Sequence, residues 1–373
     1  MRTEIVIVQR YFYNFREGFF NYLNSIVPDF KLINSVKSRG RVTVHKNIVS
    51  KCSYIYPIKS ININDNIVWF PFLFFSLLKL NPNVIVTEGG QNTINNIQIR
   101  LYCLLMSRQY IVWDLGKGYQ DFGNSLSRRI YMHFYTRLLK KATYVYGYNS
   151  CSKEYFLSLG VPKERIFIMN NTIDTIAVKE TILKSSHEMP EDLRLIHSNE
   201  KIFIIFVGSL LPTKKIEDLV PIMRGLGDKY HLLLIGSGTK EYETQLKSIF
   251  FEVNHTFLGY KQIEQLFPYY KVSSFAILPG LGGLSINQAM AFGLPVLCTH
   301  ADGAEKDIVH NDITGYIYNN IYDVVVYIKN KSNEDWERMG KAAENLLYSE
   351  FSIEQEATRF LNGINYLENG SKK

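Results

Sequence analysis

The sequence predicts an α/β protein of two doubly wound, Rossmann-like domains, and three observations support this prediction. The length of 373 residues suits two domains of ordinary size. Short apolar runs typical of buried strands alternate with segments of helical periodicity in both halves of the chain. A polar stretch at residues 179–200, which contains Pro190, separates the halves. This alternation implies parallel sheets with helices on both faces.

In the first half, apolar runs and periodic segments follow one another regularly. Strands are expected at residues 5–9, 83–87, 110–113, 144–147 and 166–169. Helices are expected around residues 15–23, 92–106 and 125–141, with a further helix between the last two strands. The first domain is therefore predicted to span residues 1–185.

The second half repeats the pattern more clearly. Strands are expected at residues 202–207, 231–235, 256–258, 274–278 and 295–298, and helices at 216–226, 242–250 and from residue 284. Gly293 and Pro295 form a helix stop. This domain is predicted to span residues 186–350. A capping box at Ser352 and Gln355 begins a final helix within residues 351–373, which is expected to return to the first domain.

Charge is unevenly divided between the two halves. The net charge is +7, yet residues 1–185 hold 24 Lys and Arg against 11 Asp and Glu, while residues 186–373 hold 18 against 24. A basic first half fits anionic lipid headgroups or a phosphate-bearing acceptor. We expect no nucleic-acid partner, because no nucleic-acid-binding motif is present.

The chain shows neither a secretory signal nor a membrane span. Residues 1–4 lead directly into the first predicted strand, and no apolar run reaches the ~18–20 residues that a transmembrane helix needs. The longest run, residues 67–78, indicates either a buried helix or a surface that enters a membrane interface. We expect a cytoplasmic protein that can contact the inner face of an anionic membrane peripherally.

The most informative segment is a strand, a glycine loop and a helix start at residues 274–296. Gly280, Gly282 and Gly283 let the backbone approach a ligand closely. The free N–H groups of the helix that starts at Leu284 favour a phosphate. A glycine loop before a helix is weak evidence by itself, because such a loop can be only a tight turn.

The same segment resembles the donor-binding signature of glycosyltransferase family 4. Gly283-Leu284 and the run Ala-Met-Ala-Phe-Gly-Leu-Pro-Val at residues 289–296 match this signature closely. Two acidic positions depart from it, since Gly280 and Gln288 stand where the family has Glu. The resemblance implies a GT-B fold, in which the two Rossmann-like domains face each other across a cleft. It also implies retention of anomeric configuration with no agreed protein nucleophile, so we assign no catalytic residue.

Further matches lie in register over nearly the whole chain, strongly from residue 202 to 316 and loosely before 110. The loop after the strand at 202–207 resembles the one that brings an Arg and a Lys to the donor diphosphate. Lys214 matches the Lys, whereas Ser209 replaces the Arg. Tyr260 falls in the loop that touches the nucleobase. The resemblance thus assigns donor binding to Gly208, Ser209, Lys214, Tyr260, Gly280, Leu281, Gly282, Gly283, Leu284, Ser285 and Gln288.

The departures predict a weakened donor site. An amide at Gln288 forms weaker hydrogen bonds to ribose hydroxyls than a carboxylate would. Gly280 changes which sugar fits or leaves room for a bulkier substituent. Ser209 removes one positive charge from the diphosphate, so Lys214 must balance more of the charge.

Acceptor contacts are expected in the first domain. Arg10 and Tyr11 follow the first strand, Trp113 ends the strand at 110–113 and Lys117 follows it, so all four are candidates to line the cleft. Solvated or packing roles remain the alternative for each. The basic helix at 125–141 is either a solvated surface or a contact for a membrane or an anionic acceptor.

No metal or cofactor is expected. The four cysteines form no CxxC pair, and the eight histidines show no metal-ligand spacing. The acidic group Asp302, Glu305 and Asp307 lies within the matching family frame, where it has no metal role.

The sequence therefore predicts a glycosyltransferase acting from a nucleoside-diphosphate sugar onto a saccharide or lipid-linked acceptor. Cell-surface polysaccharide synthesis (capsule, O-antigen or exopolysaccharide) is the expected setting. One alternative is a catalytically silent GT-B partner protein, since three donor-site positions depart from the family. Another is a sugar-nucleotide epimerase, which would convert the donor without an acceptor.

Overall fold

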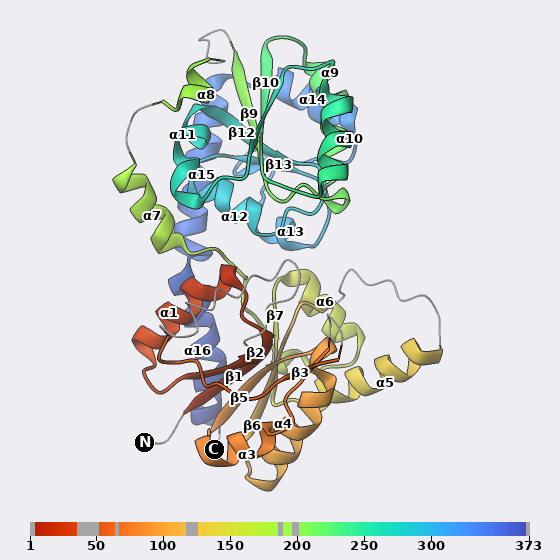
Figure 1. Ribbon diagram of the computed structural model, residues 1–373, viewed down its shortest axis with the longest axis vertical. Coiled ribbons are helices and arrows are strands. Elements are labelled where there is room, and N and C mark those ends of the chain that lie inside the picture. Colours follow the sequence, from red (N-terminus) through yellow and green to blue (C-terminus); the bar gives the residue numbers. More distant parts are fainter. Residues whose placement is uncertain are drawn as a thin grey trace. The chain divides into compact units, whose positions relative to one another are not determined.

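The computed structural model describes residues 4–35, 52–63, 67–116, 126–185, 189–195 and 201–370. The chain forms two compact units (Figure 1): unit 1 contains Met1–Asp174 and Ile353–Lys373, and unit 2 contains Thr175–Ser352. The sequence analysis set the boundary between the domains at residues 185 and 186. The structure sets it eleven residues earlier, because helix α7 (Thr175–Lys184) packs on helix α11 (Ile263–Val272) of unit 2.

Unit 1 is built on a six-stranded parallel sheet with the order β2-β1-β5-β6-β7-β8. The strands are β1 (Ile5–Tyr11), β2 (Lys31–Ser35), β5 (Val84–Glu88), β6 (Gln109–Asp114), β7 (Tyr144–Gly147) and β8 (Ile166–Ile168). A separate antiparallel pair joins β3 (Ile61–Asn62) to β4 (Val68–Trp69). The sequence analysis missed β2, in which only Leu32 and Ile33 are apolar and the consecutive polar residues Asn34 and Ser35 end the run.

Helices cover both faces of this sheet. Helices α1 (Glu17–Ile26) and α16 (Ile353–Gly370) share one core with the strand residues Ile5 and Ile7. The alternate residues Val6 and Val8 point to a second core. This second core contains side chains of α3 (Leu73–Leu80), α4 (Thr93–Leu105), α5 (Leu126–Lys141) and α6 (Ser150–Ser158). The strands are apolar on both faces, as parallel strands between two helical layers require.

The last helix, α16, completes the core of unit 1. Phe360 is fully buried, and its ring lies 5.7 Å from the ring of Phe19 and 5.7 Å from that of Tyr146. The Tyr146 hydroxyl donates a 3.0 Å hydrogen bond to the carbonyl oxygen of Phe360. A segment distant in sequence thus fills one face of the first sheet.

Unit 2 holds a second six-stranded parallel sheet with the order β11-β10-β9-β12-β13-β14. The strands are β9 (Ile202–Val207), β10 (Tyr230–Ile235), β11 (His255–Gly259), β12 (Ser273–Leu278), β13 (Val296–Cys298) and β14 (Gly315–Ile317). Besides α7 and α11, its helices are α8 (Glu191–Arg194), α9 (Leu219–Leu226), α10 (Lys240–Phe250), α12 (Leu284–Ala291), α13 (Ala304–Ile308), α14 (Ile321–Lys329) and α15 (Asn333–Glu350). The predicted pair of doubly wound α/β domains is therefore confirmed. Within the described ranges, no helix is long and apolar enough to cross a bilayer.

Candidate functional site

The centre of unit 2 has the geometry of a ligand site. Strand β9 lies between β10 and β12, so the strand order reverses between β9 and β12. In open α/β sheets, ligands bind at the carboxyl ends of the strands at such a reversal. The loops that follow β9 and β12 contain most of the donor-binding residues predicted from the sequence.

Gly280 allows these two loops to touch. A Cβ atom at Gly280 would lie 2.6 Å from the carbonyl oxygen of Thr213 and 2.6 Å from the carbonyl carbon of Lys214. The backbone N–H of Leu281 donates a 3.1 Å hydrogen bond to the same Thr213 oxygen. The sequence analysis expected Gly280 to change which sugar fits or to leave room for a bulkier substituent. The structure instead fills this space with backbone, so glycine at residue 280 has a packing role.

Lys214 connects the two loops through its ammonium group. Its Nζ donates to the carbonyl oxygens of Leu281 and Gly282, the second at 3.2 Å. Burial lowers the pKa of Lys214, and the negative charge of Asp302 partly opposes this shift. The ammonium group of Lys214, which the sequence analysis expected to contact the donor diphosphate, is thus held at the glycine loop.

Helix α12 begins directly at this loop. Its N-cap is Gly283, whose φ of +54° is unfavourable for residues with a side chain. Glycine supplies no capping side chain, and at this positive end of the helix dipole the N–H groups of Ser285 and Ile286 donate to the carbonyl oxygens of Gly282 and Gly283, both at 3.3 Å. Leu284 and Ser285 form the first turn and are half-buried. An anionic ligand is the natural occupant of this geometry.

The loop after β13 forms the neighbouring wall. The buried carboxylate of Glu305 accepts hydrogen bonds from the backbone N–H groups of Ala301 and Gly303, both at 2.9 Å. These bonds fix Asp302, whose Oδ2 lies 3.7 Å from the position of a Cβ on Gly283. Glu305 therefore has a loop-shaping role. Among the described side chains, no group of three or more His, Cys, Asp or Glu could hold a metal ion.

The remaining predicted donor residues lie at different distances from this centre along the sheet. Gly208 lies beside α12, since a Cβ there would be 3.4 Å from Ser285 Oγ, and Ser209 is exposed. Gln288 is one turn into α12, and its Oε1 accepts a 3.4 Å hydrogen bond from Tyr270. Tyr260 follows β11, the edge strand, and is 71% exposed.

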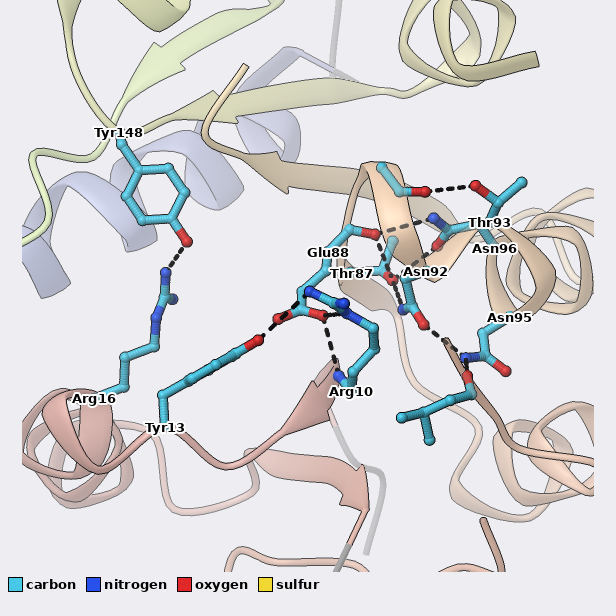
Figure 2. A network of polar contacts seen from close by, with 12 residues as sticks. Arg10, Tyr13, Arg16, Thr87, Glu88, Asn92, Thr93, Asn95, Asn96 and Tyr148 are labelled. Atoms are coloured by element: carbon cyan, nitrogen blue, oxygen red, sulfur yellow. Dashed lines mark hydrogen bonds and ion pairs between the residues drawn. The ribbon is translucent and has the colours of Figure 1, made fainter. Parts of the chain in front are cut away.

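Unit 1 has its own reversal of strand order, between β1 and β5. Arg10 on β1 and Glu88 at the end of β5 pair at this point (Figure 2). The Nε and the backbone N–H of Arg10 donate to the same Glu88 oxygen, at 2.9 and 3.1 Å. Tyr13 accepts a 3.5 Å bond from Arg10. Arg10 thus lies in a largely buried polar centre at the end of β1, and its acceptor contact remains a prediction.

The other acceptor candidates have different environments. Tyr11 and Trp113 are 4% and 3% exposed, so their side chains belong to the cores of unit 1. The guanidinium of Arg16 lies 3.9 Å above the Trp113 ring and donates to the Tyr148 hydroxyl. Arg16 is itself 2% exposed and belongs to the same buried cluster as Trp113. Lys117 lies outside the described residues.

Glu88 and Asp114 are candidates that the sequence analysis missed. Both end parallel strands, β5 and β6, a position that should have marked them. Burial raises the pKa of Asp114 to about 6, against an opposing hydrogen bond from the Gly116 backbone. A Cβ on Gly89 would lie 1.9 Å from Asp114 Oδ2, so glycine at residue 89 lets the two strand ends approach each other.

A network of amides and hydroxyls ties this centre to helix α4, as Figure 2 shows. Thr87 donates a 2.8 Å hydrogen bond to Asn96, and Asn96 donates a 3.0 Å bond to the carbonyl oxygen of Glu88. Asn92 donates to Thr87 at 3.0 Å and accepts from Asn95 at 2.6 Å. These buried partners, which lie at the start of α4, hold Glu88 in place at the end of β5.

Unit 2 is similar to a known enzyme family. Residues 191–344 match the model of the family described as glycosyl transferases group 1, and this range contains the entire glycine-loop site. This match agrees with the family resemblance of the motifs in unit 2, whereas the finer assignment to family 4 remains a prediction.

The comparisons extend from this domain to the whole fold. An uncharacterized glycosyltransferase of Methanocaldococcus jannaschii, MJ1607, is 25% identical over 178 residues, which is 45% of each chain. The match thus spans less than half of that relative. Among solved structures, Alr3699/HepE of Anabaena in complex with UDP superposes with a TM-score of 0.74 at 12% identity, covering 97% of this chain and 100% of that one.

A glycosyltransferase of Rickettsia africae gives a TM-score of 0.73 at 15% identity, covering 97% of both chains. Sucrose-phosphate synthase of Thermosynechococcus elongatus gives 0.69 at 14% identity, covering 99% of this chain and 100% of that one. At these identities the likeness shows the fold alone, which is the GT-B fold of two Rossmann-like domains.

Proposed function

We propose that the protein is a retaining glycosyltransferase that moves a sugar from a nucleoside-diphosphate sugar to a saccharide or lipid-linked acceptor. The observation that carries the proposal is the junction of the β9 and β12 loops. There, the Lys214 ammonium and the start of α12 meet the glycine loop inside a glycosyl transferases group 1 domain. We further propose a cytoplasmic setting in cell-surface polysaccharide synthesis.

The proposed donor carries uridine diphosphate. Solved structures of the same fold are complexes with UDP and with UDP-glucose. Lys214 and the positive end of the α12 dipole would balance the diphosphate charge, and Gln288 would donate to or accept from a ribose hydroxyl. The diphosphate of any nucleotide sugar carries the same charge, so the base must be decided by measurement.

The reaction breaks the bond between the anomeric carbon and the diphosphate oxygen. The electron pair leaves with the diphosphate, where Lys214 and the α12 N-terminus stabilise it. The acceptor hydroxyl oxygen then bonds the anomeric carbon on the face that the diphosphate left, and its proton passes to an oxygen of the leaving diphosphate. Lys214 and the N-terminus of α12 stabilise the negative charge that develops on the diphosphate more strongly than they would in water, because a partly buried site screens charges weakly.

The acceptor side of the proposal rests on Arg10, Glu88 and Asp114. Carboxylates at strand ends commonly orient sugar hydroxyls through charge-assisted hydrogen bonds. Glu88 already accepts two bonds from Arg10, so a substrate hydroxyl would compete with or extend an existing network. Asp114, with its pKa near 6, can change protonation within the physiological range.

Donor binding provides the first test. Titration calorimetry with UDP, GDP, ADP and dTDP should give binding with one base, which we expect to be UDP. Lys214→Met should weaken it roughly tenfold to a hundredfold, because a charged hydrogen bond contributes about 1.5–3 kcal/mol. Lys240→Met is the matched control, since Lys240 is an exposed lysine at the start of α10 in the same unit.

The outcomes separate three functions. Binding of UDP-sugar with transfer to an added acceptor supports the proposal, and conversion of the donor without an acceptor would identify an epimerase. Nucleotide binding without any turnover would point to a catalytically silent partner protein. If no nucleotide bound, or if Lys214→Met and Lys240→Met bound equally well, the proposed donor site would be wrong.

A further inference from the structure

The outer faces of helices α3 and α4 are apolar although they face solvent. Nine large apolar side chains there are between 38% and 66% exposed. They are Phe72, Phe75, Leu78, Ile94, Ile97, Leu101, Leu104, Leu105 and Met106. We call this set the α3–α4 apolar face. Exposed apolar patches on this scale usually mark an interaction site.

The apolar face is not a consequence of core packing. The core contacts of α3 come from Leu73 and Leu77, and those of α4 from Ile99, Tyr102 and Cys103. On α4, the exposed residues recur at helical spacing, beginning at Ile94 and Ile97 and continuing through Leu101 and Leu104. Both helices thus carry a second apolar stripe on the side opposite the core.

The two stripes belong to one surface, because α3 and α4 pack side by side (Figure 1). The Phe74 ring meets the Tyr102 ring edge-on at 6.3 Å, and the Phe74 backbone N–H donates to Gln98 at 3.4 Å. Gln98 lies between Ile94 and Leu101 on the helix surface. The exposed stripe of α4 therefore adjoins α3.

The charged side chains on the helices of this face have one sign. The sequences of α3, α4 and α5 contain no Asp or Glu. Lys79 and Arg100 lie on α3 and α4, and exposed Lys140 and Lys141 end α5. The Arg100 guanidinium donates a 3.1 Å hydrogen bond to the carbonyl oxygen of Lys141, so the basic end of α5 lies next to α4.

We propose that the α3–α4 apolar face binds the surface of an anionic phospholipid bilayer. The apolar stripes would enter the boundary between headgroups and acyl chains, and the flanking cations would pair with anionic headgroups. Charge complementarity favours this occupant over a second copy of the chain, because two such basic faces would repel each other.

The position of α4 links the proposed bilayer contact to the proposed acceptor site around Glu88. The first turn of helix α4 contains Asn96, which donates to the carbonyl oxygen of Glu88, and the first exposed apolar residue of α4 is Ile94. A bilayer on this face would therefore lie near the polar centre of unit 1. This deepens the proposed function by favouring a lipid-linked acceptor, yet vesicle binding needs no nucleotide, so the two proposals can fail separately.

Vesicle co-sedimentation of the full chain tests the proposal. Wild-type protein should bind vesicles of phosphatidylcholine mixed with phosphatidylglycerol and bind pure phosphatidylcholine vesicles at least tenfold more weakly. The triple variant Phe75→Ser, Ile97→Ser, Leu104→Ser should lose at least a hundredfold in affinity for the mixed vesicles, since each buried side chain contributes about tenfold. Its melting temperature should be unchanged, because these side chains are exposed.

A matched triple variant, Leu183→Ser, Phe251→Ser, Ile313→Ser, removes exposed apolar residues of unit 2 and should bind the mixed vesicles like wild type. Lys140→Glu with Lys141→Glu should weaken binding to mixed vesicles alone. The proposal is overturned if the α3–α4 variant binds as well as wild type, or if wild type binds neither vesicle. It is equally overturned if the wild type forms a concentration-dependent dimer that the α3–α4 variant abolishes.

Discussion

At the residue scale, Gly280 shows how one missing side chain organises the candidate donor site. We expect Gly280→Ala to weaken UDP binding at least tenfold and to destabilise unit 2 by about 1–3 kcal/mol, because the new Cβ would meet the Thr213 carbonyl oxygen at 2.6 Å. Calorimetric titration and thermal unfolding check both effects. Unchanged UDP binding would mean that the contact between the loops does not shape the site.

Glu356 provides a residue-scale prediction on pH. Its carboxyl group is buried, and this burial raises its pKa to about 8, partly opposed by Arg16. A Glu in the unfolded chain has its ordinary pKa of 4.5, so the unfolded chain loses this proton first as pH rises. Stability of unit 1 should therefore decrease between about pH 4.5 and pH 8, by several kcal/mol at most.

Glu356→Gln removes this titration. The variant should lose less stability than wild type between pH 5 and pH 8, as measured by urea unfolding at each pH. Glu241→Gln on the surface of α10 serves as the control and should follow wild type. If the two variants had the same pH dependence, the proton on Glu356 would not be held by the fold.

At the scale of elements, α16 is the part of unit 1 that comes from the far end of the chain. Phe360→Ala should destabilise unit 1 by about 3–5 kcal/mol, because it leaves a cavity against Phe19, Trp113 and Tyr146. Phe250→Ala in α10 is the matched change in unit 2, where Phe250 is also fully buried.

Scanning calorimetry can separate the two effects, provided that each unit gives its own transition. Phe360→Ala should lower the transition of unit 1 and Phe250→Ala that of unit 2. If Phe360→Ala affected only the unit 2 transition, the assignment of α16 to the core of unit 1 would have to be abandoned.

At the scale of the whole molecule, the two sheets have separate cores and separate polar centres. A nucleotide that binds unit 2 should raise the transition of unit 2 alone. At a concentration 100 times its dissociation constant, UDP should stabilise this unit by about 2.7 kcal/mol. A shift of the unit 1 transition of equal size would instead place the nucleotide site, or part of it, in unit 1.

Much of the donor-side centre could be predicted because its signals are local. The apolar strand at residues 273–278, the glycines at 280–283 and the helix start at Leu284 are adjacent in sequence and remain adjacent in the structure. In contrast, Glu88 and Asp114 carry no local motif. They become a polar centre only because β5 and β6 pair in parallel beside β1.

The sequence by itself determined the two doubly wound domains and the glycine loop, because periodicity and turn residues act over a few neighbouring positions. Only the tertiary structure decided that Gly280 packs on Thr213, that Tyr11 and Trp113 are buried, and that Arg10 pairs with Glu88. These outcomes depend on residues that are distant along the chain. Parallel strand order sets such distant contacts, and no local pattern records it.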